Sequence, residues 1–166
     1  MYIDIETDLA CSRIWLIGLL IEGELIQLYA DNWGEERQIL VEFLEILQKY
    51  PEYKLVSYSG TDFDYRVPIA ALRRQGLSAI LLESHQHLDL SYAVRNCFIF
   101  PNQSFALKEL GAYLQYPFKH PDLDGMLVAF KYMKHAEDGD REIIRYNEDD
   151  VRVLPYLIST FKKIHL

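Results

Sequence analysis

The first thirty residues contain three strand-like segments in succession, and this pattern constrains the fold more than any other feature. The segments are residues 2–6, 14–21 and 25–29, and a Gly-containing turn joins the last two. The first segment alternates, so Asp4 and Glu6 share one of its faces. Three strands with short connections predict a sheet built from the N-terminal part of the chain.

The rest of the chain alternates between helical and extended patterns before it becomes mostly helical. A right-handed crossover through a helix after the third strand makes the first and fourth strands parallel neighbours at the centre of the sheet. We therefore predict an α/β fold with a mixed five-stranded sheet and helices on both faces, in a single domain over residues 1–166. The expected later elements are a helix at 34–50, a strand at 53–58, a helix at 62–75, a strand near 87–90, and helices at 104–114, 123–134 and 140–164.

Composition excludes several classes of protein. The longest uncharged apolar run, residues 14–21, is far shorter than the ~20 residues that a membrane span needs. No basic segment precedes an apolar core at the start, so we expect no signal peptide. Cys11 and Cys97 are too few for a disulfide framework, which favours a cytoplasmic protein with reduced thiols.

The pair Asp4-x-Glu6 is the first candidate for chemistry. Residues two apart on a strand project from the same side, so the two carboxylates face one way. A solvent-facing pair on an edge strand would show the same pattern. The pair alone is therefore a weak signal.

The segment 58–64 is the second candidate. It ends a strand, turns at Gly60 and places Asp62 and Asp64 where a helix begins. Asp62 is suited to cap that helix, and Asp64 lies one turn further in, which favours Asp64 as a ligand. The sequence leaves open a contribution from Asp62.

The third candidate lies in the last helix. Tyr146 and Asp150 are four residues apart and share one helical face. Glu148 and Asp149 point elsewhere and are expected on a solvated face. An isolated Tyr–Asp pair is more often structural, so its value depends on the other carboxylates.

Together these acidic residues suit a metal-dependent reaction. Hard oxygen ligands from several elements bind Mg²⁺ or Mn²⁺, and crowded carboxylates repel each other unless cations are present. A pair of ions ~4 Å apart assists in-line attack on a phosphodiester. Tyr146 would hydrogen-bond and orient the attacking water.

In order and spacing the chain resembles the DEDDy group of the DnaQ-like 3′–5′ exonuclease superfamily. The matching motifs are Asp-x-Glu-Thr at 4–7, Phe-Asp at 63–64 and Tyr-x-x-x-Asp at 146–150. The branch of small ribonuclease-H-like exonucleases is the most similar, because it shares an Ile-Gly-rich second strand, here Leu16-Ile17-Gly18, and a Tyr-Asn-Glu-Asp-Asp-Val box at 146–151.

The resemblance implies a ribonuclease-H-like fold and hydrolysis with two Mg²⁺ or Mn²⁺ ions that releases 5′-mononucleotides. It implies that Thr7 and Leu9 line the site for the 3′-terminal nucleotide. The family often carries Asn at the position of Ser59, a departure that concerns substrate orientation. The implied ligands are Asp4, Glu6, Asp64 and Asp150.

The net charge of −8 argues against wide, sequence-blind wrapping of a duplex. We therefore expect the substrate to be the 3′ end of single-stranded DNA or RNA, and a homo-oligomer is possible. Two alternatives stay open. One is a structure-specific endonuclease of the same fold, and the other is a catalytically silent nucleic-acid-binding module.

Other features have ordinary interpretations. His85-x-His87-x-Asp89 could suggest a transition-metal site, but no further Cys or His lies at a helpful spacing. Asp122 and Asp124 precede a helix and are suited to cap it. Several single basic residues could contact phosphates, although such residues are usually just solvated. The candidates are Arg66, Lys108, Lys119, Lys131 and Arg145.

Overall fold

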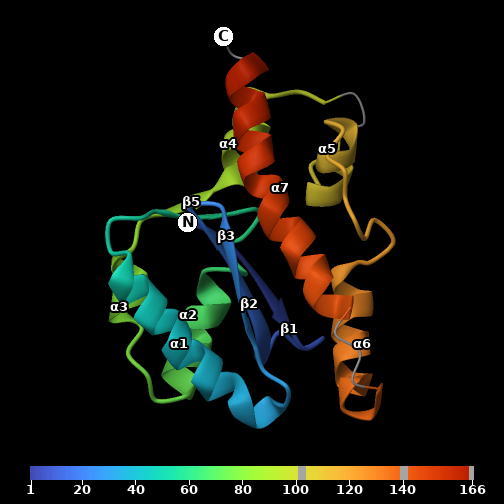
Figure 1. Ribbon diagram of the computed structural model, residues 1–166. Coiled ribbons are helices and arrows are strands. Elements are labelled where there is room, and N and C mark those ends of the chain that lie inside the picture. The colour runs from blue at the N-terminus through green and yellow to red at the C-terminus, as the bar shows by residue number, and fades with distance from the viewer. Residues whose placement is uncertain (101–103, 139–141, 165–166) are drawn as a thin grey trace.

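The computed structural model describes residues 1–100, 104–138 and 142–164. A five-stranded sheet in the order β3-β2-β1-β4-β5 forms its centre (Figure 1). The strands are β1 (Tyr2–Thr7), β2 (Ile14–Ile21), β3 (Glu24–Tyr29), β4 (Leu55–Ser57) and β5 (His87–Asp89).

The pairing of the strands confirms the predicted mixed sheet. β1 is antiparallel to β2, with Ile5 opposite Ile17, and parallel to β4, with Tyr2 opposite Val56. β4 and β5 are also parallel. The carboxyl ends of three parallel strands therefore meet at one edge of the sheet, and the register of β1 shifts just there, between Glu6 and Thr7.

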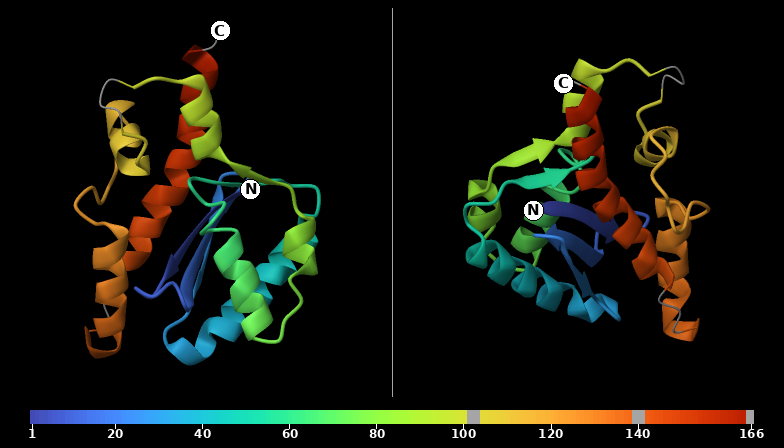
Figure 2. Two further views of the ribbon diagram at one scale, coloured as in Figure 1. Left: turned by 180° about the vertical axis from the view of Figure 1, so that it is seen from behind. Right: turned by 45° about the horizontal axis from the view of Figure 1, so that its top comes forward.

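Helices cover both faces of this sheet. In Figure 1, α1, α2 and α3 lie on one side, and α7 crosses the other side with α5 and α6 beside it; Figure 2 shows the same layers from two further directions. No helix within the described ranges is long and apolar enough to cross a membrane. The helices are η1 (Trp33–Glu35), α1 (Glu36–Lys49), α2 (Arg66–Arg74), α3 (Ile80–Ser84), α4 (Leu90–Cys97), α5 (Leu107–Tyr113), α6 (Gly125–Asp138) and α7 (Glu142–Ile164).

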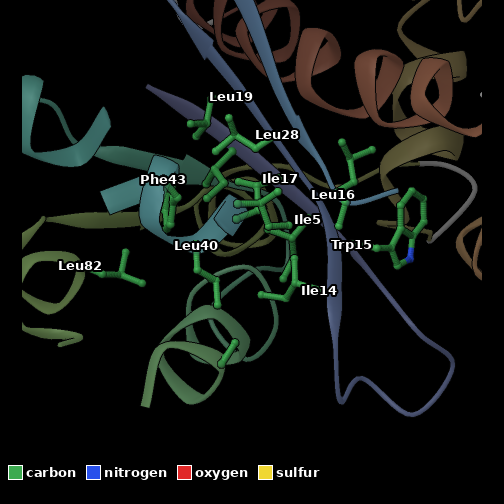
Figure 3. Close-up of a cluster of buried hydrophobic side chains, with 14 of the residues drawn as sticks. Ile5, Ile14, Trp15, Leu16, Ile17, Leu19, Leu28, Leu40, Phe43 and Leu82 are labelled. Carbon is green, nitrogen blue, oxygen red and sulfur yellow. The ribbon is translucent and has the colours of Figure 1, made fainter. Parts of the chain in front are cut away.

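The main hydrophobic core lies between the sheet and α1. Leu40 and Phe43 follow the helical spacing of α1 and pack onto strand residues such as Ile17 and Leu28 (Figure 3). All eight residues of β2 are buried, because helices lie over both of its faces. β1, next to it, is the central strand of the sheet.

α6 is fixed to the sheet by an aromatic stack and by a hydrogen bond. The ring of Tyr132 stacks on Trp15 of β2, with 4.4 Å between centroids and 9° between planes. Its hydroxyl donates to the carbonyl of Ala30 at 2.7 Å. This contact holds α6 beside the carboxyl end of β1.

The sequence prediction was wrong at several boundaries. The helix expected from residue 62 begins at Arg66, because the amides of Phe63 and Tyr65 turn back to the carbonyl of Gly60. α3 and α4 were not predicted, and α4 begins where Asp89 accepts from the amide of Ser91 at 3.0 Å. The expected start of the last helix, at residue 140, lies outside the described residues.

Candidate active site

Asp4 and Glu6 both lie on β1 and line one cavity at the carboxyl end of that strand. Opposite Asp4 on β2 stands Gly18. A Cβ atom there would lie 2.0 Å from Oδ1 of Asn147, so only glycine allows Asn147 to lie against the strand. The strand pairing and the glycine together bring α7 close to the carboxylate of Asp4.

Asn147 is a site residue that the sequence reasoning missed. It is fully buried, and its Nδ2 donates to the backbone carbonyl of Asp4 at 3.1 Å and to Asp4 Oδ2 at 2.7 Å. Its Oδ1 accepts from Gln27 Nε2 at 3.0 Å. The available signal was its place directly after Tyr146 in the acidic box of the last helix.

Asp64 lies beside β1, as the loop prediction required. It is buried, and its Oδ1 accepts from the amide of Ile5, the residue between Asp4 and Glu6, at 3.2 Å. Gly60 makes this approach possible, since a Cβ atom there would lie 2.4 Å from Asp64 Oδ2.

Asp62 differs from Asp64 in its exposure and in its partners. Its side chain is 74% exposed and pairs with Arg66 at 2.8 Å. α2 has no side-chain cap, so the interpretation of Asp62 as its N-cap was wrong. Of these two acids, only Asp64 faces the carboxylates of β1.

α7 contributes Tyr146 and Asp150, one helical turn apart and both buried. The hydroxyl of Tyr146 lies close enough to the carboxylate of Asp150 for each group to shift the pKa of the other. Asp150 Oδ1 is buried and has no hydrogen-bond partner within the described part of the chain. A buried acceptor without a donor is costly, which makes this atom a candidate for binding a cation.

The solvated face predicted for Glu148 and Asp149 was wrong for Asp149. Only 1% of Asp149 is exposed, and its Oδ2 accepts from the amides of Lys119 and His120 at 2.9 and 2.8 Å. Glu148 pairs with Lys119 at 3.2 Å and with Arg152 at 2.7 Å. Glu148 and Asp149 therefore also hold the loop between α5 and α6 in place.

Thr7 and Leu9 line the same cavity, which encloses about 470 Å³. Thr7 is buried and donates to the carbonyl of Asp8 at 2.9 Å, whereas Leu9 is 53% exposed. A volume of this size suits one small molecule or the end of a chain. The lining residues are Asp4, Ile5, Glu6, Thr7, Asp8, Leu9, Cys11, Phe63, Gly125, Met126, Ala129, Tyr146 and Asp150.

Burial is the main cause that raises the pKa values of all four predicted ligands, and the charges of neighbouring acids add to it. Burial, followed by the charges of its acidic neighbours, raises the pKa of Asp4 well above its usual range, and the same causes act on Glu6. Burial raises the pKa of Asp64 to about 7 and that of Asp150 to about 6. These shifts show that the carboxylates are close enough to interact and short of compensating positive charge.

Tyr146 is held in its neutral form. Burial, followed by the charge of Asp150, raises the pKa of its hydroxyl far above the usual value. A phenol in this state donates a hydrogen bond and does not serve as a general base near neutral pH.

The donor set fits a hard divalent cation in its chemistry. It consists of carboxylate oxygens, including the unpartnered Oδ1 of Asp150. Within residues 1–100, 104–138 and 142–164, no three His, Cys, Asp or Glu side chains already form a metal-binding group. Asp4 Oδ2 accepts from Asn147 Nδ2, and Asp64 Oδ1 accepts from the amide of Ile5.

Two further sequence features are placed clearly. His85 is buried with both ring nitrogens near backbone carbonyls, whereas His87 contacts Ser57 Oγ at 2.8 Å, so the two do not form a shared site. Asp124 caps α6 by accepting from the amide of Leu127 at 2.8 Å, while Asp122 is exposed.

Ser59 occupies a position with a backbone requirement of its own. Its φ is 56°, in the left-handed region that Asn adopts more readily than Ser. Its amide donates to Asp89 Oδ1 at 2.9 Å, which holds the conformation in place. The backbone here offers a reason for Asn at this position that is independent of any substrate.

The chain belongs to the RNase H superfamily, which it matches over residues 1–161. No curated protein matches it. Membership of this superfamily indicates a nuclease that acts on nucleic acid, and nucleases of this fold generally use divalent metal ions.

Proposed function

We propose that the protein is a 3′–5′ exonuclease of the DEDDy type that acts on single-stranded nucleic acid. The observation that carries this proposal is the meeting of Asp4, Glu6, Asp64 and Asp150 at one end of β1. Burial raises all four pKa values, and the charges of the other ligands raise those of Asp4, Glu6 and Asp64 further. Proteins retain such a costly arrangement where it performs a function.

Asp4, Glu6, Asp64 and Asp150 would hold Mg²⁺ or Mn²⁺, and we propose two ions. When bound, the ions supply Lewis acidity at the phosphate and lower the pKa of water. Positive charge at this position would remove the repulsion among the carboxylates and satisfy Asp150 Oδ1. Asn147 would keep Asp4 in position through its bond to Oδ2.

Tyr146 would orient the reacting water or the scissile phosphate by donating a hydrogen bond. Its raised pKa supports a donor role and disfavours a role as a base. Its nearness to Asp150 would leave the hydroxyl beside the atoms that hold the ions. Tyr146 would thus act through orientation and not by removing the proton.

The lining of the cavity and the charge of the protein support action at the end of a nucleic-acid strand. Thr7 and Leu9 form a wall next to the carboxylates, and the exposed part of Leu9 offers an apolar surface for the terminal base. The net charge of −8 gives little attraction for a long duplex. A short unpaired 3′ end would enter the cavity without the phosphate contacts that a duplex requires.

Digestion of end-labelled oligonucleotides tests the proposal. Single-stranded DNA and RNA, labelled at the 5′ end, are incubated with Mg²⁺ or Mn²⁺, and we expect a ladder that shortens one nucleotide at a time from the 3′ end. The released products should be 5′-mononucleotides. Asp150→Asn serves as the inactive control.

A 3′-phosphate-blocked strand separates the alternatives. An exonuclease that needs a free 3′ hydroxyl should leave this strand intact, whereas an endonuclease should cut it as fast as the unblocked one. Failure to cut any single strand, duplex or RNA–DNA hybrid with either metal would favour a silent binding module.

A further inference from the structure

The side chain of Lys108 points into the protein and not to solvent. Lys108 lies in the first turn of α5, is half-buried, and donates to the backbone carbonyl of His120 at 3.2 Å and to that of Leu123. Its Nζ lies 4.1 Å from the centroid of the Tyr146 ring. The expectation that this lysine is simply solvated was therefore wrong.

The loop between α5 and α6 is held from two sides by opposite charges. Lys108 binds its carbonyl groups, and Asp149 of α7 accepts from its amides at Lys119 and His120. The loop leads directly into α6, where Gly125 lies next to the cavity. Lys108 therefore ties the start of α6 to the face of α7 that carries Tyr146.

The ring of Tyr146 lies between Lys108 and the start of α6. A Cβ atom on Gly125 would lie 3.8 Å from the Tyr146 hydroxyl, an ordinary contact distance, so the start of α6 adjoins the hydroxyl. On another side the ammonium of Lys108 is within the distance at which cations attract aromatic faces. The hydroxyl lies near Asp150, with which it interacts.

Lys108 also supplies positive charge to the acidic site. Its charge lowers the pKa of Glu6 and of Asp150, against the larger effect of burial that raises both. The ammonium is fixed by the two carbonyls, so this charge has a defined place. A mobile surface lysine would not provide this.

We propose that Lys108 is a positioning residue for Tyr146: held by the α5–α6 loop, its ammonium fixes the tyrosine ring so that the hydroxyl meets Asp150. The catalytic consequence rests on the proposed nuclease function, but the geometric claim does not. Lys108 thus acts through Tyr146 and does not need to touch the substrate.

The first test compares Lys108→Met, Lys108→Arg and a matched control. Lys49 lies over the Tyr50 ring at 5.1 Å, far from the carboxylates, and Lys49→Met removes a similar contact. We expect Lys108→Met to lower kcat about tenfold, as groups that orient catalytic residues do, with KM nearly unchanged. Lys108→Arg should be intermediate, and Lys49→Met should match the wild type.

A double-mutant cycle with Tyr146→Phe identifies the route of the effect. If Lys108 acts through the hydroxyl, Lys108→Met should cost little further rate once that hydroxyl is gone. Equal loss of kcat in both backgrounds would overturn the proposal, because Lys108 would then act independently of Tyr146.

Fluorine NMR of protein labelled with fluorotyrosine tests the geometry without any cleavage. The Tyr146 resonance is assigned by its loss in Tyr146→Phe, and we expect it to move in Lys108→Met, to move less in Lys108→Arg, and to stay in place in Lys49→Met. An unmoved resonance in Lys108→Arg and Lys108→Met contradicts the proposal. If Lys108→Met does not fold, Lys108→Arg alone decides. A lower rate in Lys108→Arg with an unmoved Tyr146 resonance would then also contradict the proposal. A wild type that cleaves nothing would refute the nuclease proposal while this readout still decides the role of Lys108.

Discussion

The buried carboxylate of Asp89 and the buried carboxylates at the end of β1 differ in how many hydrogen-bond donors surround them. Asp89, at the end of β5, accepts from the amides of Ser59, Thr61 and Ser91 and from the hydroxyls of Thr61 and Ser91. Burial alone would raise its pKa, but these donors outweigh burial, and its pKa is lowered.

The carboxylates at the end of β1 are in the opposite situation. Their pKa values are raised, and Asp150 Oδ1 has no donor among the described residues. The contrast separates an acid that holds a loop together from acids whose burial is not offset by positive charge or by hydrogen-bond donors. We infer that the first kind stabilises the fold and that the second kind awaits a cation.

The largest expected effect comes from Asp→Asn changes at the cavity. Asp4→Asn and Asp150→Asn should each lower turnover at least ~100-fold, since altering groups that merely support metal ligands already costs 10- to 100-fold. Because each change relieves repulsion, the metal-free protein should melt at the same temperature or higher. Cleavage rates and thermal melting with a chelator measure the two effects. A lower melting temperature for both variants would speak against a strained cluster.

The same substitution at Asp89 should have the opposite effect on stability. Asp89→Asn places an amide against donors that need an acceptor, and we expect a loss of about 1–3 kcal/mol in the free energy of unfolding. Denaturant unfolding with and without Mg²⁺ measures this loss, which should be present in both conditions. An Asp89→Asn protein as stable as the wild type would remove the contrast between the two regions.

Tyr146→Phe should have a smaller effect on the reaction. Loss of the hydroxyl beside Asp150 should slow hydrolysis roughly 10- to 100-fold and leave Mn²⁺ affinity nearly unchanged. Rates at saturating metal, together with a metal titration, distinguish the two quantities. Unaltered rates would deny the tyrosine a part in the reaction.

The smallest expected effect is a dependence of stability on pH. The folded-state pKa values of Asp64 and Asp150, about 7 and about 6, lie above those of the unfolded chain. Their protonation therefore favours the fold at low pH, and this contribution is lost as pH rises through 6 and 7. With a chelator, melting temperatures should fall between about pH 5 and pH 8, and Asp64→Asn should reduce the fall. A flat profile for the wild type would be inconsistent with raised pKa values.

Sequence patterns predicted the elements that carry their own periodicity. The alternation in β1, the apolar run of β2 and the amphipathic face of α1 gave the sheet order around β1 and the layer packed on it. α3 and α4 are short and depend on contacts such as the cap at Asp89, which no local pattern indicates.

The candidate site was predictable only in part for a similar reason. The acids stand in recognisable local motifs, and the structure brings them to one end of β1. Asn147 acts on Asp4, which is 143 positions away, and Lys108 acts on backbone carbonyls of a loop. The packing of α5 and α7 brings these partners together, so their spacing in the sequence does not show which group each one contacts.

The most direct test of the cation claim is a Mn²⁺ titration followed by electron paramagnetic resonance. The free-ion signal should be suppressed until about two ions per chain are bound, as a paired-metal site requires. Asp89→Asn should bind like the wild type, and Asp4→Asn and Asp150→Asn should bind weakly. Undiminished free-ion signal from the first addition of Mn²⁺ to the wild-type protein would contradict the account.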